Sequence, residues 1–182
     1  MSESLQVLAV CTHNRTRSVI MGALLQQQVE RADRSIAVSS AGCSERGGEP
    51  PTHEAVRLLA ARNIDVSGHL SHFLSKPGVT GADLIVTAEH HHVITIAGRW
   101  PEVYDRTFTL PEIVELGERV GPRGERTHRQ WLGAVHTERP SPIDYLDHDV
   151  GEIADPTGGS PKQWSTCFTQ IDDLTHRLIA LL

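Results

Sequence analysis

The sequence places a cysteine and an arginine six residues apart, Cys11 and Arg17. Their types and spacing suit nucleophilic catalysis better than those of any other residues in the chain. Cys11 ends an apolar run that begins at Leu5, and a helical pattern follows Arg17. A thiol placed where a strand ends and a helix begins lies near backbone N–H groups and the positive end of the helix dipole, which stabilise a thiolate. An arginine guanidinium is a planar fork of donors that matches an oxyanion. Together these residues predict attack by Cys11 on a tetrahedral oxyanion such as phosphate.

The loop around Cys11 also admits a structural interpretation, in which the thiol is a small buried hydrophobe at the end of a strand. Its other residues favour the functional interpretation. Asn14 tolerates left-handed backbone angles and can hold the loop through its side chain. Ser18 can hydrogen-bond the sulfur, cap the following helix, or do both. Arg15 either adds positive charge that favours an acidic substrate or is a solvated arginine.

The elements that must position this loop are short apolar segments alternating with helical patterns. We expect strands over residues 5–10, 36–40, 84–86 and 103–110, the last of them at an edge. We expect helices over residues 18–32, 52–63 and 162–182, and others that start near residues 89 and 111. This alternation predicts a three-layer α/β fold, a four-stranded parallel doubly wound sheet with helices on both faces. Ligands bind such sheets at the carboxyl ends of strands, which agrees with the place of Cys11.

The order of motifs along the chain resembles the low-molecular-weight protein tyrosine phosphatases and the related thiol-dependent arsenate reductases. The resemblance rests first on Cys-x5-Arg-Ser after the first strand. It continues through Ser40-Ala41-Gly42 as a turn after the second strand, Gly48-Glu49-Pro50, the helix over 52–63, and Ile64-Asp65 with His69 and Ser71. It ends with Asp155-Pro156 in a loop before the last helix.

The resemblance implies a phosphomonoester hydrolase that works through a cysteinyl-phosphate intermediate. Cys11 would attack as a thiolate, the Arg17 guanidinium would hold the phosphoryl oxygens, and Asp155 would protonate the leaving oxygen and then activate water. An ordinary Asp-Pro turn is the alternative for Asp155, and Asp144, Asp147 and Asp149 are the other acids that could serve. Ser40 and His69 would support the loop. The phosphate-binding residues would be Thr12, His13, Asn14, Arg15, Thr16, Arg17 and Ser18.

Four residues depart from the pattern of the family. His13 stands where the tyrosine phosphatases usually have glycine, and Cys-x-His-Asn is more similar to the arsenate-reductase branch. Thr16 replaces a second cysteine that is common in the loop. Thr157 and Gly158 stand where an aromatic pair often follows Asp-Pro. Because that pair forms a wall of the phosphotyrosine cleft, its replacement weakens the case for a phosphotyrosine preference.

Two other functions stay open. One is arsenate reduction with an external thiol, because the chain lacks a closely spaced cysteine pair and Cys43 is the only plausible additional thiol. Cys167 lies on the apolar stripe of the last helix, and we expect it in the core. The other is a non-catalytic module that binds a phosphorylated ligand. The presence of Cys11, Arg17, Ser18 and Asp155 argues against that module.

Length and composition narrow the classes further. The 182 residues predict one domain, 1–182, in which 117–150 is an enlarged connection of helix and loop. A net charge of −6 argues against a nucleic-acid partner, and no apolar run approaches the roughly 20 residues that span a membrane. The polar residues 1–4 do not read as a secretory signal, and the three cysteines fit neither a disulfide framework nor a zinc site. We expect a cytoplasmic protein without a cofactor, whose partner is a phosphorylated protein or a small phosphoester.

Three adjacent histidines, residues 90–92, raise the question of a metal site. Adjacent residues on a helix point about 100° apart, so we expect that these side chains do not converge on one ion. No carboxylate or fourth ligand stands at an obvious spacing. We therefore predict no metal site, with one histidine at the rim of the active site and the others on the solvated face of a helix.

Overall fold

The computed structural model describes residues 4–45 and 47–182, so the expectation for residues 1–3 lies outside the described part. In that part, a parallel sheet has the strand order β2-β1-β3-β4. The strands are β1 (Leu5–Cys11), β2 (Ile36–Gly42), β3 (Leu84–Thr87) and β4 (Thr107–Thr109). β1 lies between β2 and β3 and is buried along almost its whole length. This arrangement confirms the predicted four-stranded parallel sheet.

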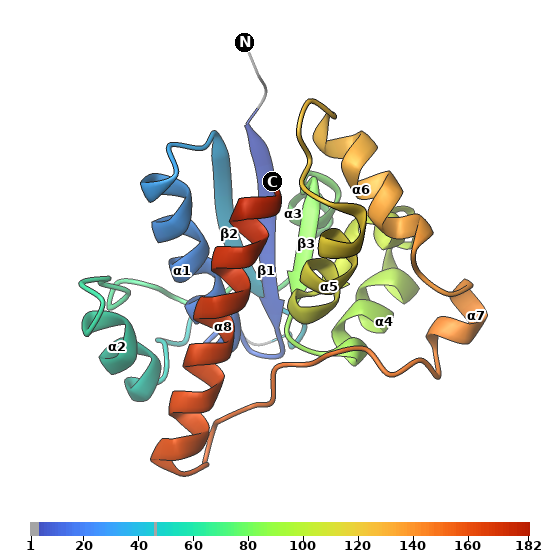
Figure 1. Ribbon diagram of the computed structural model, residues 1–182. Coiled ribbons are helices and arrows are strands. Elements are labelled where there is room, and N and C mark those ends of the chain that lie inside the picture. The colour runs from blue at the N-terminus through green and yellow to red at the C-terminus, as the bar shows by residue number, and fades with distance from the viewer. Residues whose placement is uncertain (1–3, 46) are drawn as a thin grey trace.

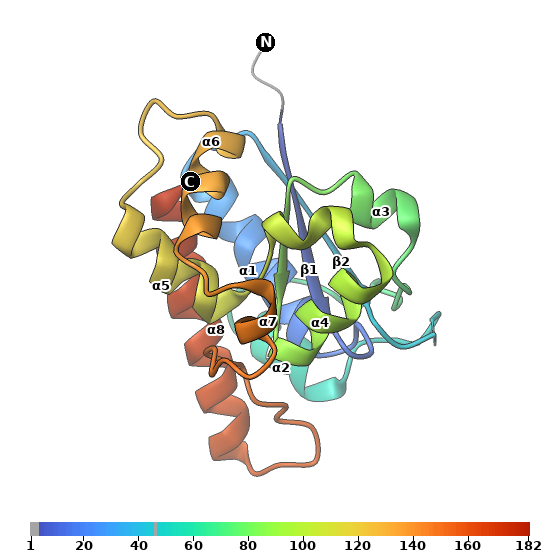
Figure 2. The same ribbon diagram turned by 90° about the vertical axis from the view of Figure 1, so that its right-hand side faces the viewer.

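Helices cover both faces of the sheet, which confirms the three layers (Figures 1 and 2). On one face, the largest core cluster joins β1 to α1 (Arg17–Arg31), α5 (Leu110–Val120) and α8 (Pro161–Leu181). On the other face, a second cluster joins β1 and β3 to α3 (Lys76–Thr80), α4 (His90–Arg99) and the 3-10 helix η1 (Pro101–Arg106). α2 (His53–Ala60) is shorter than predicted, and α3 was not predicted. Within the described residues, no helix combines the length and apolar character that crossing a membrane requires.

The carboxyl ends of the parallel strands lie together at the lower edge of the sheet in Figure 1. The loop after β1 starts at this edge, and the segment between α7 (Pro142–Tyr145) and α8 runs beneath it. A backbone hydrogen bond of 2.8 Å from Ile153 to the Ala88 carbonyl fixes that segment to the end of β3. Residues that are far apart in sequence therefore meet below β1.

The second strand is longer than predicted, because the expected Ser40-Ala41-Gly42 turn is part of β2. Gly42 is the partner of Cys11 in the parallel register. A Cβ atom at Gly42 would stand 2.8 Å from the Thr12 carbonyl oxygen, which is too close for any other residue type. The glycine thus serves the close approach of the loop after β1 rather than a turn.

The fourth strand is shorter than predicted, because the residues from Pro101 to Arg106 form η1. Pro101 stands in the first turn of η1, where its fixed φ angle suits a helix. Only Thr107–Thr109 pair with β3, at the predicted edge of the sheet. All three residues are nevertheless buried, because α4, α5 and the segment around Arg139 pack over them.

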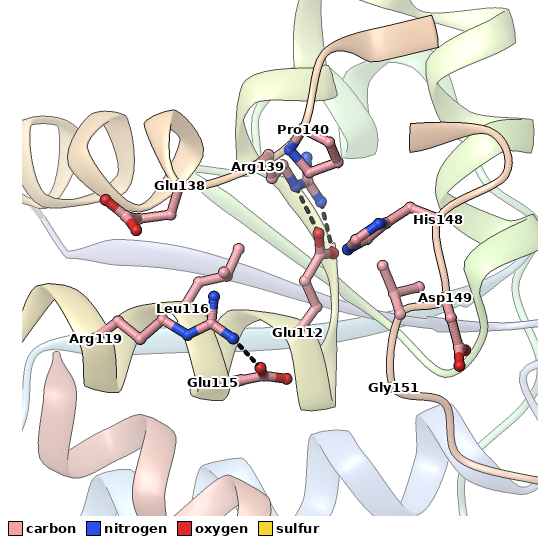
Figure 3. A pocket seen from close by; sticks show the side chains of 11 residues that line it. Glu112, Glu115, Leu116, Arg119, Glu138, Arg139, Pro140, His148, Asp149 and Gly151 are labelled. Carbon is pink, nitrogen blue, oxygen red and sulfur yellow. Dashed lines mark hydrogen bonds and ion pairs between the residues drawn. The ribbon is translucent and has the colours of Figure 1, made fainter. Parts of the chain in front are cut away.

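Residues 117–150 contain the end of α5, the helix α6 (His128–Thr137) and the short α7. Arg139, between α6 and α7, is buried and donates from Nε and Nη2 to the two carboxylate oxygens of Glu112 at 2.7 Å. Its guanidinium also lies over the rings of Tyr104, Phe108 and Tyr145. Figure 3 shows this ion pair beside a cavity of about 80 Å³. The pair ties the segment to α5 and to the edge of the sheet.

Candidate active site

The loop between β1 and α1 presents unused backbone donors. The carbonyl groups of Thr12, Asn14 and Arg15 accept hydrogen bonds from Ser44 N, His69 Nε2 and Thr52 N, respectively. In the described chain, by contrast, no N–H group of residues 12–17 donates to another protein group. With these carbonyls held from outside and its N–H groups unpaired, the loop keeps backbone donors available for an anion.

The predicted nucleophile lies at the base of this loop. Cys11 is buried at the end of β1, and its sulfur is 3.1 Å from the Ser18 hydroxyl oxygen in the first turn of α1. That oxygen accepts a hydrogen bond of 3.0 Å from Asn14 Nδ2. The serine hydrogen is therefore available to the sulfur, where it stabilises a thiolate.

Asn14 holds the loop in shape. Its φ of 55° is the left-handed conformation that we expected. Its fully buried side chain donates to Ser40 Oγ at 2.9 Å and accepts from the His72 backbone N–H at 2.8 Å. The backbone carbonyl oxygen of Asn14 is 3.0 Å from His69 Nε2. The structure thus brings Ser40 and His69 to the loop through Asn14, without direct contact with Cys11.

Arg17 is buried beside Cys11, and three acceptors fix its guanidinium. Nη1 donates to the Ile153 carbonyl at 2.9 Å and pairs with Glu89 at 2.6 Å. Nη2 pairs with Asp155 at 3.0 Å. The first two acceptors hold the plane of the guanidinium, and the third is a carboxylate from the loop before α8.

Asp155 is half-exposed and faces the loop, as the position of its Asp-Pro pair predicts. Burial raises the pKa of Asp155, but the hydrogen bonds from Thr157 and the charges of Arg17 and His13 lower it by a larger amount. The net result is a pKa below the ordinary value of an aspartate. An incoming anion that takes Arg17 away from Asp155 would remove one of these causes and favour the protonated carboxyl.

A cavity of about 260 Å³ unites these groups. Of the predicted residues, Asn14 and Ser18 are fully buried and do not line it. The alternative acids Asp144, Asp147 and Asp149 do not line it, and Asp149 lies on the separate cavity of Figure 3. Its lining residues are Cys11, Thr12, His13, Arg15, Thr16, Arg17, Glu49, Thr52, Asp155 and Thr157.

Arg15, at the rim of the cavity, matches neither of its two expected roles. Its Nη1 pairs with Glu49 at 2.5 Å, and its Nε donates to the Pro50 carbonyl at 2.8 Å. Arg15 is therefore neither a free positive charge nor a fully solvated arginine. Because Glu49 offsets its charge, the rim does not select acidic substrates through this residue.

Two residues at the start of α4 also reach the site. Sequence reasoning missed Glu89 and expected one histidine of residues 90–92 at the rim without saying which; His92 is the one that contacts the loop, and it is buried rather than at the rim. Glu89 pairs with Arg17, and the fully buried His92 places its Nε2 3.0 Å from the Thr12 hydroxyl oxygen. Burial, together with the neighbouring His91 and Arg17, lowers the pKa of His92 to about 3 against a smaller opposite effect of Asp155. The available signal was position, because both residues follow the carboxyl end of β3, which neighbours β1.

Two of the three adjacent histidines converge, contrary to the expectation from helix geometry. Ligand atoms of Glu89, His91 and His92 lie within 4.8 Å of one another, so the two adjacent histidines do converge. Glu89 is, however, already paired with Arg17, and His92 Nε2 is bonded to Thr12. A cation there would face the Arg17 guanidinium, so we assign no metal to this cluster.

The three cysteines are all free thiols in different surroundings. Cys43 packs with the core cluster on the face of the sheet opposite to that of Cys11. Burial, and then the nearby Cys11, raises the pKa of Cys43 to about 12. Cys167 lies in the same core cluster as Cys11, as predicted, and burial raises its pKa to about 11. Neither thiol is readily ionised at neutral pH.

Comparisons with known proteins agree with this geometry. Residues 6–119 match the family model described as low molecular weight phosphotyrosine protein phosphatase. A protein-arginine-phosphatase of Bacillus subtilis (strain 168) is 32% identical over 174 residues, which cover 96% of this chain and 94% of that protein. The low molecular weight protein-tyrosine-phosphatase Wzb of Escherichia coli (strain K12) is 27% identical over 146 residues, covering 73% of this chain and 97% of Wzb.

The solved structure of the YwlE arginine phosphatase from Geobacillus stearothermophilus is similar throughout. Its TM-score is 0.71 at 26% identity, and the match covers 96% of this chain and 90% of that one. The similarity in structure therefore extends beyond residue 119, where the match to the family model ends.

Proposed function

The chain belongs to the low molecular weight phosphotyrosine protein phosphatase family, and from this premise we propose that it hydrolyses phosphorylated protein side chains through a phosphate ester of Cys11. The observation that carries the proposal is that Cys11, Arg17 and Asp155 line one cavity together with residues of a loop whose backbone N–H groups have no protein acceptor in the described chain. Each of these groups has a necessary role in a double displacement at phosphorus.

In the first step, the Cys11 thiolate attacks phosphorus. The S–P bond forms while the bond from phosphorus to the leaving atom breaks. The N–H groups of residues 12–17 and the Arg17 guanidinium stabilise the charge on the phosphoryl oxygens. Asp155, protonated once the substrate has replaced it at Arg17, donates its proton to the leaving atom.

In the second step, water attacks the phosphorus of the cysteinyl phosphate. The Asp155 carboxylate takes a proton from the water, the S–P bond breaks, and phosphate leaves. Ser18, which is 3.1 Å from the sulfur, stabilises the departing thiolate as it stabilised the attacking one. The cycle restores each group to its starting state without an external reductant or oxidant.

Phosphoarginine is the substrate class that we place ahead of phosphotyrosine. None of the described residues that line the cavity is Phe, Tyr or Trp, so an aromatic ring finds no stacking partner there. The relative from Bacillus subtilis that matches 96% of this chain is named for protein-arginine phosphatase activity. The bond broken would be P–N rather than P–O, with the proton of Asp155 going to nitrogen.

The two other candidate functions have less support. An internal relay of thiols for arsenate reduction would need Cys43, which packs on the opposite face of the sheet and resists ionisation. An external thiol would still permit the reaction. A purely binding module would not need an acid such as Asp155 at the cavity.

Side-by-side assays separate these functions. Wild type and Cys11→Ser are each given p-nitrophenyl phosphate, a phosphoarginine peptide, a phosphotyrosine peptide of the same sequence, and arsenate with glutathione. We expect hydrolysis that disappears in Cys11→Ser, with the largest kcat/KM on phosphoarginine. Thiol-dependent arsenite formation without ester hydrolysis would support the reductase, and phosphate binding without turnover would support the binding module.

We also propose that residues 1–182 form one domain and that the protein works in a reducing compartment such as the cytoplasm. The burial of Arg139 against Glu112 supports the first proposal, because it joins 117–150 to the sheet. The need for a free Cys11 thiolate supports the second.

A further inference from the structure

The first turn of α4 fixes the orientation of the His92 ring. The Glu89 backbone N–H donates to His92 Nδ1 at 3.2 Å, and the Glu89 side chain accepts from the His92 backbone N–H. This reciprocal capping box begins α4. The ring is fully buried, so its position is set by these contacts and by its packing.

These contacts also determine where the ring carries its proton. Nδ1 accepts from Glu89, so it has no hydrogen of its own. Burial lowers the pKa of His92 to about 3, so the ring is neutral at physiological pH. A neutral imidazole has one N–H group, which must then be Nε2. His92 therefore donates to the Thr12 hydroxyl oxygen, 3.0 Å away.

The Thr12 hydroxyl is left with a hydrogen to donate. Its oxygen accepts from His92, and in the described chain Oγ1 has no other protein partner. Thr12 directly follows Cys11, and both residues line the cavity together with Arg17. An oxygen atom of a molecule bound in the cavity is the acceptor that this hydroxyl lacks.

We propose that the Thr12 hydroxyl binds a phosphoryl oxygen of the substrate and that His92 is the positioning residue that directs it. The proposal rests on the proposed function, which assigns the backbone of the loop, but no side-chain hydroxyl, to the phosphate. The ligand class is a tetrahedral oxyanion, free or esterified. Hydrogen bonds from a hydroxyl to a charged oxygen are among the stronger ones in proteins.

The same turn of α4 contacts two residues that line the cavity. His92 holds Thr12, and Glu89 holds Arg17 through the 2.6 Å pair. Glu89 also accepts from the backbone of His92, so the two supports are hydrogen-bonded to each other. A role for His92 as mere core filling would require neither the bond to Thr12 nor the fixed tautomer.

Matched substitutions separate the two contacts of His92. His92→Gln keeps an N–H donor near the position of Nε2, whereas His92→Asn keeps an acceptor near Nδ1 but cannot reach Thr12. Thr12→Val removes the hydroxyl at equal volume, and Thr12→Ser restores it. For each variant, the affinity for inorganic phosphate is measured as protection of Cys11 from iodoacetate, and kcat and KM are measured on p-nitrophenyl phosphate.

We expect Thr12→Val and His92→Asn each to weaken phosphate binding about tenfold, the loss of about one hydrogen bond to a charged group. Thr12→Ser and His92→Gln should stay within about threefold of wild type. The double variant Thr12→Val/His92→Asn should bind phosphate no more weakly than Thr12→Val alone, because the two residues act through one hydrogen bond. Additive losses, or unchanged binding in Thr12→Val, would overturn the proposal.

A second measurement needs no substitution. The ¹⁵N chemical shifts of the His92 ring in the intact protein report whether the hydrogen is on Nε2, as we expect, or on Nδ1, which would refute the proposed direction of the bond. If the wild type binds phosphate but hydrolyses no ester, the proposed function fails, while the phosphate affinities still decide the roles of Thr12 and His92.

Discussion

Two buried arginines in this protein lie in surroundings of opposite kinds. The side chains of Arg17 and Arg139 are 3% and 1% exposed, and each pairs with carboxylates. Arg139 meets Glu112, whose side chain is 5% exposed, and three aromatic rings lie against its guanidinium. Arg17 meets Asp155, whose side chain is 44% exposed and lines an open cavity.

The difference lies in whether a partner can be exchanged. Glu112 is not open to exchange at Arg139, because both side chains are almost fully buried beside a cavity of only about 80 Å³, and Nη1 and Nη2 also donate to the Tyr104 and Thr107 carbonyls. A substrate oxyanion can replace Asp155 at Arg17, because both residues face the cavity. A buried arginine therefore holds the fold where all its partners are internal, and serves a site where one partner is loosely held.

The largest expected effect is on stability, when Arg139 with its internal partners is replaced. Arg139→Met leaves the buried Glu112 without its counter-charge, and we expect the free energy of unfolding to fall by about 3–5 kcal/mol. Urea denaturation measures the loss. The double variant Arg139→Met/Glu112→Gln removes the stranded charge and keeps the cap on Thr109, so it should recover part of the loss. A single variant as stable as wild type would contradict the structural role of Arg139.

Replacement of Arg17, which faces the cavity, should reduce activity more than stability. Arg17→Lys keeps the charge but loses the planar fork, and we expect kcat/KM on p-nitrophenyl phosphate to fall about 10²–10³-fold. The free energy of unfolding should change less than in Arg139→Met. Arg139→Lys is the control, and the folded fraction of that variant should retain nearly the wild-type kcat. Equal losses of activity in both lysine variants would remove the distinction between the two arginines.

The sequence predicted the role of Arg17 but not that of Arg139. Arg17 stands at a fixed spacing from Cys11 within one loop, so local order determines their proximity. The Asp155 loop was found because the resemblance places it before the last helix. Arg139 meets Glu112 across 27 residues of a segment without a family pattern, and only the packing of α6 against α5 brings them together.

The errors in the strands have a similar origin. The polar and apolar residues from Val103 to Arg106 fit a strand by composition, but Pro101 starts a helical turn and limits β4 to three residues. The roles of Glu89 and His92 depend on the strand order, since β3 must lie beside β1 for α4 to reach the loop. Motif spacing carries no information about that order.

The pH dependence of stability sharpens the comparison, because His92 belongs to the region of Arg17. Its folded pKa of about 3 lies below that of an unfolded histidine. Between these values the unfolded chain binds the additional proton, so stability falls as the pH falls below about 6.5. We expect a loss of about 2 kcal/mol from this residue at about pH 5, measured by urea denaturation. His92→Gln should flatten that slope, and an unchanged slope would place the titration elsewhere.

The smallest expected effect is the change in the free energy of unfolding when Asp155, the partner of Arg17, is replaced. The folded pKa of Asp155 lies below its unfolded value, so its contribution to stability is present above about pH 4 and is lost as the pH falls through the folded pKa. Because the side chain is 44% exposed, solvent screens the pair, and we expect Asp155→Asn to cost less than about 1 kcal/mol at neutral pH. Added salt should reduce even that difference. The same variant should bind phosphate more tightly than wild type, since no carboxylate then competes for Arg17, while its turnover falls. A loss of several kcal/mol on replacing Asp155 would make this pair as structural as that of Glu112 with Arg139, and the substrate could not then displace it.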